Sequence, residues 1–311
     1  MRALVTGGAG FIGSNLVDAL ITRGNDVVVL DNFSSGRRER LEHFDDRLSL
    51  VEGDLRSYER VHAAMDGIEV VFHQGALPSI PRSIQDPLTT SAVNVEGTLN
   101  VLLAARDADV RRVILASSSS IYGDAPGLPR HEEQRPSPLA PYAVSKLAAE
   151  SYCSAFWKVY GLETVALRYF NVFGPGQDPS SQYAAVVPRF ITALLDGERP
   201  VIYGDGEQSR DFTFVQDVVN ANLLAAEAGD VAGEVFNVAA GRSRTVNELA
   251  SSIAEVIGAS VAPMYASARP GDVRASAADI EKARTMLGYE PADSFDEGLI
   301  ATIAFFRSQQ R

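Results

Sequence analysis

A tyrosine and a lysine lie four residues apart in the segment Tyr142-Ala-Val-Ser-Lys146. Side chains at positions i and i+4 of a helix point to the same side, and Pro141 is typical of a first helical turn. A free tyrosine ionises near pH ~10, so making half of it a phenolate at neutral pH requires about 4 kcal/mol. A neighbouring ammonium group favours that charged form. The pair therefore predicts an acid–base centre in which Tyr142 moves a proton and Lys146 lowers its pKa.

Four consecutive serines form a second candidate site. Ser117 to Ser120 follow the apolar run Val113-Ile-Leu115 and precede Ile121. Such a run places hydroxyls at the carboxyl edge of a sheet, where ligands bind in open α/β folds. A flexible polar loop is the alternative interpretation, but the apolar residues on both sides favour an ordered site in which a serine bonds a substrate hydroxyl.

A glycine-rich loop follows the first apolar run of the chain. Its sequence is Gly7-Gly-Ala-Gly10-Phe-Ile-Gly13. Between a strand and a helix, such a loop lets backbone amides approach a pyrophosphate at the helix N-terminus. Gly7 allows the tight turn, Gly10 leaves room for the phosphates, and Gly13 lets the helix pack closely on the sheet. A turn that binds nothing is the alternative, but the context favours a dinucleotide site.

The second predicted strand ends at Asp31, 18 residues after the last glycine of that loop. A carboxylate there accepts both hydroxyls of an adenosine ribose and repels a 2′-phosphate, which favours NAD over NADP. Arg37 and Arg38 lie just downstream and leave open either a phosphate site or a solvated loop. Asp54 and Leu55 follow the third strand and would lie beside the adenine, although an aspartate there is also typical of a helix cap.

The elements that position these residues alternate along the chain. Strand-length apolar runs at residues 3–6, 26–30, 48–52, 70–73, 112–117 and 163–170 are separated by helix-like segments, among them 11–23, a long helix after residue 87, and 142–160. This alternation predicts the α/β class, with a doubly wound parallel Rossmann sheet.

Beyond residue 173 the sequence is rich in turns and its elements are shorter. We expect a Rossmann domain over residues 1–173, to which some later segments return, and a smaller mixed α/β substrate lobe made mainly of residues 174–311. The predicted helices of this lobe are 184–195, 217–228, 246–257 and 295–306, and its predicted strands are 201–203, 234–238 and 262–265.

Composition excludes several classes of protein and partner. The chain is 46% apolar and 22% charged, which is typical of a globular protein, and its net charge of −12 disfavours nucleic acid and anionic membranes as partners. The only cysteine, Cys153, cannot form an intrachain disulfide, and we expect no metal site. There is no leader-like segment and no apolar run of ~18 residues, so we expect a cytoplasmic protein.

With these elements placed, the chain resembles the extended short-chain dehydrogenase/reductase family and, within it, the NAD-dependent nucleotide-sugar 4-epimerases. The resemblance covers nearly the whole chain. It rests on Thr6-Gly-Gly-Ala-Gly-Phe-Ile-Gly13, Asp31-Asn32, His73-Gln-Gly-Ala76, Asn94, Ser118 with Tyr142 and Lys146, Arg168-Tyr-Phe-Asn171-Val-Phe-Gly174, Gly204-Asp-Gly206, Ser209-Arg-Asp211 and Arg269-Pro-Gly-Asp272.

The resemblance implies NAD as cofactor, a UDP-sugar as substrate, and a homodimer formed through helices near residues 87–106 and 142–160. The residues that it implies around NAD are Gly7, Gly10, Phe11, Ile12, Asp31, Asn32, Ser35, Gly36, Asp54, Leu55, Gln74, Ala76, Asn94, Tyr142, Lys146 and Tyr169. The residues that it implies around the substrate are Ser79, Arg82, Ser118, Tyr142, Asn171, Val187, Tyr203, Arg210, Arg269, Asp272 and Ser276.

Within this set the resemblance also implies individual roles. Ser118 orients the substrate hydroxyl, Arg210 and Arg269 clamp the phosphates through charge-assisted hydrogen bonds, and Asp272 contacts the uridine ribose. Tyr203 either stacks on uracil or belongs to the core. In the implied reaction Tyr142 takes the 4-hydroxyl proton, aided by Lys146 and the positive nicotinamide, while hydride moves to NAD and gives a 4-keto sugar.

Three competing functions remain open. A 4,6-dehydratase would carry an Asp-Glu pair where this chain has Ser119 and Ser120. UDP-glucuronate decarboxylases and 4-epimerases also oxidise C4, although the 4-epimerases often have threonine in place of Asn171 and arginine in place of Gly176. A non-catalytic NAD-binding sensor on the same fold is the alternative of a different class.

Ser276 bears on substrate size. In the epimerases that the chain resembles, the matching residue walls the pocket beside the sugar 2-substituent and is a tyrosine where only UDP-glucose and UDP-galactose are accepted. The neighbours Ala275 and Ala277 are also small, so a shift of one residue leaves the conclusion unchanged. We therefore expect interconversion of UDP-GlcNAc and UDP-GalNAc as well as of UDP-Glc and UDP-Gal. A mere strand-to-helix turn is the alternative role of Ser276.

Overall fold

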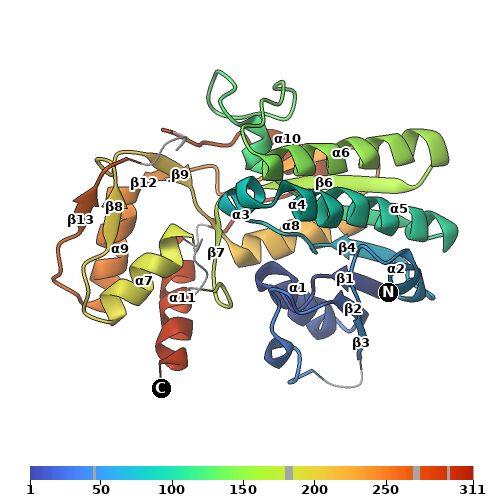
Figure 1. Cartoon of the computed structure of the whole chain (residues 1–311), viewed down its shortest axis with the longest axis horizontal. Coiled ribbons are helices and arrows are strands. Elements are labelled where there is room, and N and C mark those ends of the chain that lie inside the picture. The colour runs from blue at the N-terminus through green and yellow to red at the C-terminus, as the bar shows by residue number, and fades with distance from the viewer. Residues whose placement is uncertain (45–46, 179–184, 269–273, 293–294, 311) are drawn as a thin grey trace.

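The computed structural model describes residues 1–44, 47–178, 185–268, 274–292 and 295–310. Its centre is a seven-stranded sheet of order β11-β6-β5-β4-β1-β2-β3 in which every neighbouring pair is parallel (Figure 1). The strands are β1 (Arg2–Thr6), β2 (Asp26–Asp31), β3 (Leu48–Glu52), β4 (Val70–His73), β5 (Arg112–Ser118), β6 (Glu163–Tyr169) and β11 (Val235–Val238). The predicted doubly wound parallel sheet is confirmed.

Helices cover both faces of this sheet because successive strand residues point to opposite sides. On β1, Ala3 and Val5 join one core while Leu4 joins another, and all three are fully buried. The helices of the first core are α1 (Phe11–Thr22), α8 (Val215–Glu227) and α10 (Glu281–Leu287). Those of the second are α2 (Tyr58–Ala63), α5 (Gly97–Asp107) and α6 (Pro141–Tyr160).

The long helix expected after residue 87 is interrupted. α3 (Ile80–Gln85) and α4 (Pro87–Ser91) lead into a π-helical segment, η2 (Ala92–Glu96), before α5 begins. The π-helical segment carries the buried Asn94. Such segments are frequent at functional sites, and periodicity does not predict them. Two 3-10 turns, η1 (Arg38–Arg40) and η3 (Ser119–Tyr122), follow β2 and β5.

A smaller unit lies beside the sheet, at the left of Figure 1. Its core is formed mainly by the helices α7 (Val186–Leu195), α9 (Val246–Ile257) and α11 (Phe295–Gln309). Three two-stranded sheets complete it: β7 (Val172–Phe173) with β10 (Thr213–Phe214), β9 (Ser209–Asp211) with β12 (Ser243–Thr245), and β8 (Val201–Tyr203) with β13 (Met264–Ala266).

The assignment of 217–228 and 234–238 to the smaller lobe was wrong. β11 is an edge strand of the central sheet, where Phe236 and Val238 are fully buried, and α8 packs in the core of that sheet. The physical reason is that β11 is buried on both faces, as is typical of a strand in a parallel sheet that helices cover on both sides. The chain therefore returns to the first unit after entering the second.

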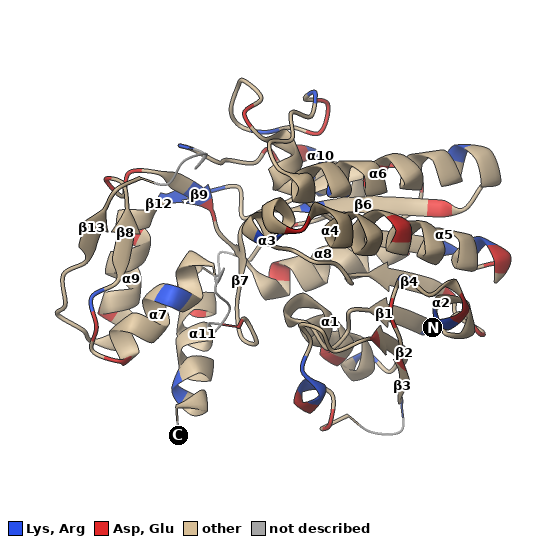
Figure 2. Ribbon diagram, viewed as in Figure 1, with Lys and Arg blue, Asp and Glu red and all other residues tan. Residues whose placement is uncertain are grey.

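Charged residues are distributed over both units. Figure 2 shows lysine and arginine interspersed with aspartate and glutamate along the ribbon, rather than gathered in one basic region. In the part of the chain that the structure describes, no helix combines the length and apolarity needed to cross a membrane.

Candidate active site

The predicted site residues gather at the carboxyl edge of the central sheet. β1, β4, β5 and β6 are parallel, so the segments that follow them emerge on the same side. Ser118, the last residue of β5, stands opposite Tyr169 at the end of β6. Thr6 and His73 end β1 and β4 as an aligned pair.

The glycine loop leaves no space for side chains. Gly7 has φ +67°, and a Cβ there would lie 2.6 Å from the Gly75 Cα. A Cβ at Gly13 would lie 2.1 Å from the Gly7 carbonyl oxygen. Gly10 is the N-cap of α1 and provides no side-chain cap, so the amides of the first turn at Phe11 and Ile12 face outward as an anion site. These features fit a dinucleotide pyrophosphate.

Asp31 is buried at the end of β2 and points to the same loop. Its Oδ2 accepts the Ala9 amide at 3.0 Å and its Oδ1 accepts the Phe33 amide at 2.8 Å. Each carboxylate oxygen has two lone pairs, so acceptor positions remain for ribose hydroxyls. At Gly36 a Cβ would approach Asp31 Oδ2 to 3.0 Å, which keeps the space beside the carboxylate open.

The two arginines that left NADP open are paired with acidic side chains. Arg37 lies 3.1 Å from Asp178, and Arg38 lies 2.6 Å from Glu52. A 2′-phosphate would have to compete with these carboxylates. The arrangement therefore favours the NAD interpretation.

The residues expected around the adenine form the far end of this site. Asn32 donates to Asp54 at 2.8 Å, and hydrogen bonds from Arg56 hold the pKa of Asp54 well below its usual range. Leu55 is buried, and a Cβ at Gly75 would lie 2.9 Å from its side chain. Ser35 is exposed.

The loop after β4 is held by side chains that the sequence placed around the cofactor. Gln74 donates to the Tyr169 hydroxyl at 3.1 Å. Asn94 accepts the Leu77 amide at 2.8 Å and donates to the Leu77 carbonyl at 3.2 Å. These bonds use much of the polar capacity of Gln74, Asn94 and Tyr169, so the three residues fix the loop that carries Ala76.

His73 links this loop to β1. The hydroxyl of Thr98 donates to the Asn94 carbonyl, so it accepts from His73 Nε2 at 2.9 Å, and His73 Nδ1 accepts from Thr6 at 2.7 Å. Burial, together with the nearby charge of Lys146, lowers the pKa of His73 to about 3. The ring is therefore neutral, and its two hydrogen bonds give it a structural role.

The predicted catalytic pair lies on the buried side of α6. Tyr142 is 8% exposed and Lys146 is 5% exposed. The Tyr142 amide donates to Ser83 Oγ at 3.0 Å, and Lys146 Nζ donates to the Ala116 carbonyl at 2.9 Å. Ser118 supplies a side-chain hydrogen bond to Tyr142. The three predicted catalytic residues therefore come together.

Burial has opposite effects on the pKa values of Tyr142 and Lys146. Burial raises the pKa of Tyr142, and the hydrogen bond with Ser118 opposes this rise. Burial also lowers the pKa of Lys146 to about 8, against the attraction of the Glu150 carboxylate. The lysine directs its ammonium group to the Ala116 carbonyl.

A cavity of about 300 Å³ lies in the smaller unit and contains four of the predicted substrate residues. Asn171, Val187, Tyr203 and Arg210 line it. Asn171 follows β6 with φ +34° and donates to the Asp211 carbonyl at 3.1 Å, which fixes its position at the mouth of the sheet. The volume is within the range of small-molecule sites.

The remaining predicted substrate residues that the structure describes are not among those that line this cavity. Ser79 caps α3 by accepting the Arg82 amide at 3.2 Å, and Arg82 is exposed. Ser276 donates its amide to the Ser209 carbonyl at 3.0 Å, beside the strand that carries Arg210. Arg269 and Asp272 lie outside the described residues.

Sequence reasoning missed two residues of the site. Ser83 is fully buried and accepts the Tyr142 amide, but it lies 59 positions away and has no local signal. Arg189 lines the cavity, and its guanidinium lies 5.5 Å from the Tyr203 ring centroid. A cation in the first turn of a helix that also presents Val187 was the available signal for it.

Comparisons with known proteins agree with this geometry. The sequence model of the NAD dependent epimerase/dehydratase family matches residues 3–239. The UDP-glucose 4-epimerase of Mycolicibacterium smegmatis is 41% identical, with 100% of each chain covered.

Two solved structures extend the comparison. The UDP-N-acetylglucosamine 4-epimerase of Methanobrevibacter ruminantium, in complex with UDP-N-acetylmuramic acid, has a TM-score of 0.95 and 43% identity, covering 99% of this chain and 98% of its own. The UDP-glucose 4-epimerase of Thermus thermophilus, in complex with NAD, has a TM-score of 0.89 and 39% identity, covering 99% of both chains.

Proposed function

The chain belongs to the NAD dependent epimerase/dehydratase family, and from this premise we propose that it is an NAD-dependent 4-epimerase of UDP-hexoses. The observation that carries the proposal is the convergence of Ser118, Tyr142 and Lys146 beside the glycine loop. The nucleotide cavity begins at Asn171, two residues beyond the strand position that faces Ser118. A hexose linked to UDP in that cavity would reach the tyrosine.

The residues that would hold NAD are those of the glycine loop, Asp31 and Lys146. The outward-facing amides of α1 suit the pyrophosphate, and Asp31 suits the adenosine ribose. Lys146 would bond the nicotinamide ribose. When bound, NAD would supply a reversible hydride acceptor for the sugar C4.

The protein groups perform the proton transfers. Ser118 orients the 4-oxygen, and Tyr142 takes the 4-hydroxyl proton and later returns it. Both the phenol and Lys146 are buried, so water does not compete for this proton. The cavity residues keep the UDP part bound while the 4-keto sugar turns over, so one tyrosine serves both faces.

The function is tested by incubating the protein separately with UDP-Glc, UDP-GlcNAc and UDP-GlcA and identifying each product by NMR. We expect C4 inversion of the two neutral sugars. Decarboxylation or inversion of UDP-GlcA alone would support the uronate enzymes, and release of a 4-keto-6-deoxy sugar would support a dehydratase. Absence of turnover on every substrate would support a binding protein.

For substrate range, we propose that Ser276 leaves room for an N-acetyl group. Its backbone is fixed against Ser209, next to the cavity residue Arg210. Ser276→Tyr should lower kcat/KM for UDP-GlcNAc by about 100-fold while UDP-Glc changes by less than about threefold, because the larger side chain fills the space of the 2-substituent.

Ser276→Ala is the matched control and should retain both activities. Steady-state kinetics on both substrates measures the effect. Equal losses on the two substrates, or a wild type inactive on UDP-GlcNAc, would refute this role.

We further propose that the protein is a cytoplasmic homodimer. An apolar stripe on the outer side of α6 supports the dimer: Val144 is 52% exposed, Tyr152 37% and Val159 70%. Leu88 of the neighbouring α4 is 82% exposed. A second copy of the chain would cover these side chains.

A further inference from the structure

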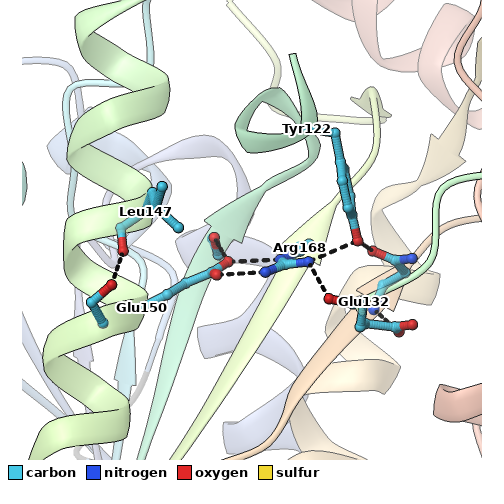
Figure 3. Close-up of polar contacts among 8 residues, drawn as sticks. Tyr122, Glu132, Leu147, Glu150 and Arg168 are labelled. Carbon is cyan, nitrogen blue, oxygen red and sulfur yellow. Dashed lines mark hydrogen bonds and ion pairs between the residues drawn. The ribbon is translucent and has the colours of Figure 1, made fainter. Parts of the chain in front are cut away.

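A buried ion pair joins helix α6 to strand β6 of the central sheet (Figure 3). Glu150 lies on α6 and Arg168 on β6, and both side chains are 5% exposed. Arg168 donates from Nε to Oε1 at 3.0 Å and from Nη2 to Oε2 at 2.8 Å, so the pair is bidentate. Arg168 also donates to the Tyr122 hydroxyl at 2.9 Å. Charges are costly to bury, and the catalytic steps above do not use this pair.

The Glu150 carboxylate is also tied to the strand that anchors Lys146. Its Oε1 accepts the hydroxyl of Ser117. Ser117 follows Ala116, whose carbonyl accepts Lys146 Nζ at 2.9 Å, and it is aligned with Arg168 across β5 and β6. Both partners of Glu150 therefore come from the central sheet.

Glu150 does not pair with the lysine that lies four residues before it on the same helix. Lys146 and Glu150 are four residues apart on one face of α6, where opposite charges commonly pair. Among the described residues, the carboxylate bonds with Arg168 and Ser117 and forms no ion pair with Lys146. Arg168 is therefore the cation that pairs with Glu150, in place of Lys146.

The other titratable groups around Lys146 are neutral at pH 7. Burial raises the pKa values of Tyr142 and Cys153 on α6. On β4, burial lowers the pKa of His73 to about 3. The charge that surrounds the lysine therefore depends on how completely Arg168 neutralises Glu150.

We propose that Arg168 is a positioning residue for Lys146: it holds the Glu150 carboxylate on Ser117 and prevents it from pairing with the lysine, whose ammonium group stays available to the Ala116 carbonyl and the cofactor. The inference deepens the proposed function and rests on it for the part that concerns the cofactor. The charge arrangement itself belongs to the protein alone.

The test is a direct titration of the lysines by NMR. The chain has three, Lys146, Lys158 and Lys282, so ¹³C- and ¹⁵N-labelled lysine gives three signals, which Lys158→Arg and Lys282→Arg assign. The full-length protein is titrated as purified and after removal of bound nucleotide. Lys146 should titrate near 8, and the signals of Lys158 and Lys282 serve as internal controls that the substitutions below should leave unchanged.

The two single variants should move the pKa of Lys146 in opposite directions. In Glu150→Gln the unpaired Arg168 cation repels the ammonium, and the pKa should fall by about one unit or more. In Arg168→Met the freed carboxylate pairs with the ammonium, and the pKa should rise by about one unit or more. In the double variant Glu150→Gln/Arg168→Met the pKa should return to within about half a unit of wild type.

A purely structural role gives a different pattern. Loosened packing would admit water to Lys146 and raise its pKa in all three variants, and that result would overturn the proposal, as would shifts below about 0.3 unit in both single variants. Thermal melting checks folding. If a single variant does not fold, the double variant, which buries no lone charge, decides: a pKa near 8 supports the proposal and a rise toward ~10 overturns it.

The titration does not depend on turnover. A protein that fails to epimerise any UDP-sugar still reports the Lys146 pKa values, and an active epimerase with unshifted values still contradicts the role of Arg168. Failure of this inference and failure of the proposed function are therefore distinguishable.

Discussion

At the scale of single residues, the site depends on one phenol whose surroundings oppose its ionisation. Burial raises the pKa of Tyr142, and Ser118 is the protein group that counteracts this effect. Lys146 is itself held by burial at a pKa of about 8 and bonds a backbone carbonyl. In the proposed mechanism, the remaining stabilisation of the phenolate would come from the positive charge of the nicotinamide.

Tyr142→Phe tests the proton acceptor. The variant should retain the fold and NAD binding but lose about 10³-fold or more in kcat, because the 4-hydroxyl proton then has no acceptor. Steady-state assays with UDP-Glc measure kcat, and calorimetry measures NAD affinity. Tyr152→Phe, on the exposed side of the same helix, is the matched control and should keep full activity. If Tyr142→Phe kept more than a tenth of the wild-type kcat, the assignment of Tyr142 as the proton acceptor would be wrong.

At the scale of secondary structure, sequence reasoning succeeded where a local rule applied. Pro141 at the first turn of α6 and the glycines of the first loop follow from backbone sterics, and the structure has them as predicted. The burial of β11 in the central sheet depends on a partner 69 residues earlier in the chain, so its apolar pattern did not reveal which unit it joins. The π-helical turn that carries Asn94 has no periodic signature.

The same limit applies to contacts between elements. Glu150 and Arg168 look like surface charges in the sequence, and their pairing requires α6 to lie on β6. Ser83 likewise acquires its role only when α3 packs against the start of α6. Motifs in the sequence yield candidates for ligand contact, whereas the residues that hold these candidates in place have no such signal.

Ser83→Ala tests how α3 positions α6. Ser83 Oγ accepts the buried amide of Tyr142, so its removal leaves that donor unpaired and should lower the free energy of unfolding by about 1–2 kcal/mol. Urea denaturation measures the change. Ser151→Ala, whose hydroxyl bonds the Leu147 carbonyl on the exposed side of α6, should change stability by less than about 0.5 kcal/mol. Equal effects of the two substitutions would contradict the role of Ser83.

At the scale of the whole molecule, the two units contribute different parts of the candidate site. The parallel sheet brings the glycine loop, Ser118 and the start of α6 to one edge, and the smaller unit provides most of the cavity wall. The chain crosses between them several times, as the return of α8 and β11 to the sheet shows (Figure 1). The outer surface of α6 carries exposed apolar side chains, which form the proposed dimer interface.

Val144→Asp tests the proposed homodimer. The wild type should have twice the chain mass of 33.4 kDa, and the variant should be a monomer because a carboxylate in an apolar interface is desolvated without a partner. Size-exclusion chromatography with light scattering measures the mass. Ile300→Asp, a similarly exposed position on α11 at 54%, should leave the dimer intact. A monomeric wild type, or a variant that remains dimeric, would contradict the proposed interface.

The central claim is that this protein inverts C4 by removing and returning the same hydride. UDP-glucose carrying deuterium at C4 tests it most directly, with the purified protein, no added NAD, and ¹H and ²H NMR of the products. We predict that the UDP-galactose product keeps its deuterium at C4 and that little deuterium appears in water. The reason is that the transferred hydride would stay in a buried site between its removal and its return. Loss of the label to solvent, or no UDP-galactose at all, would contradict the account.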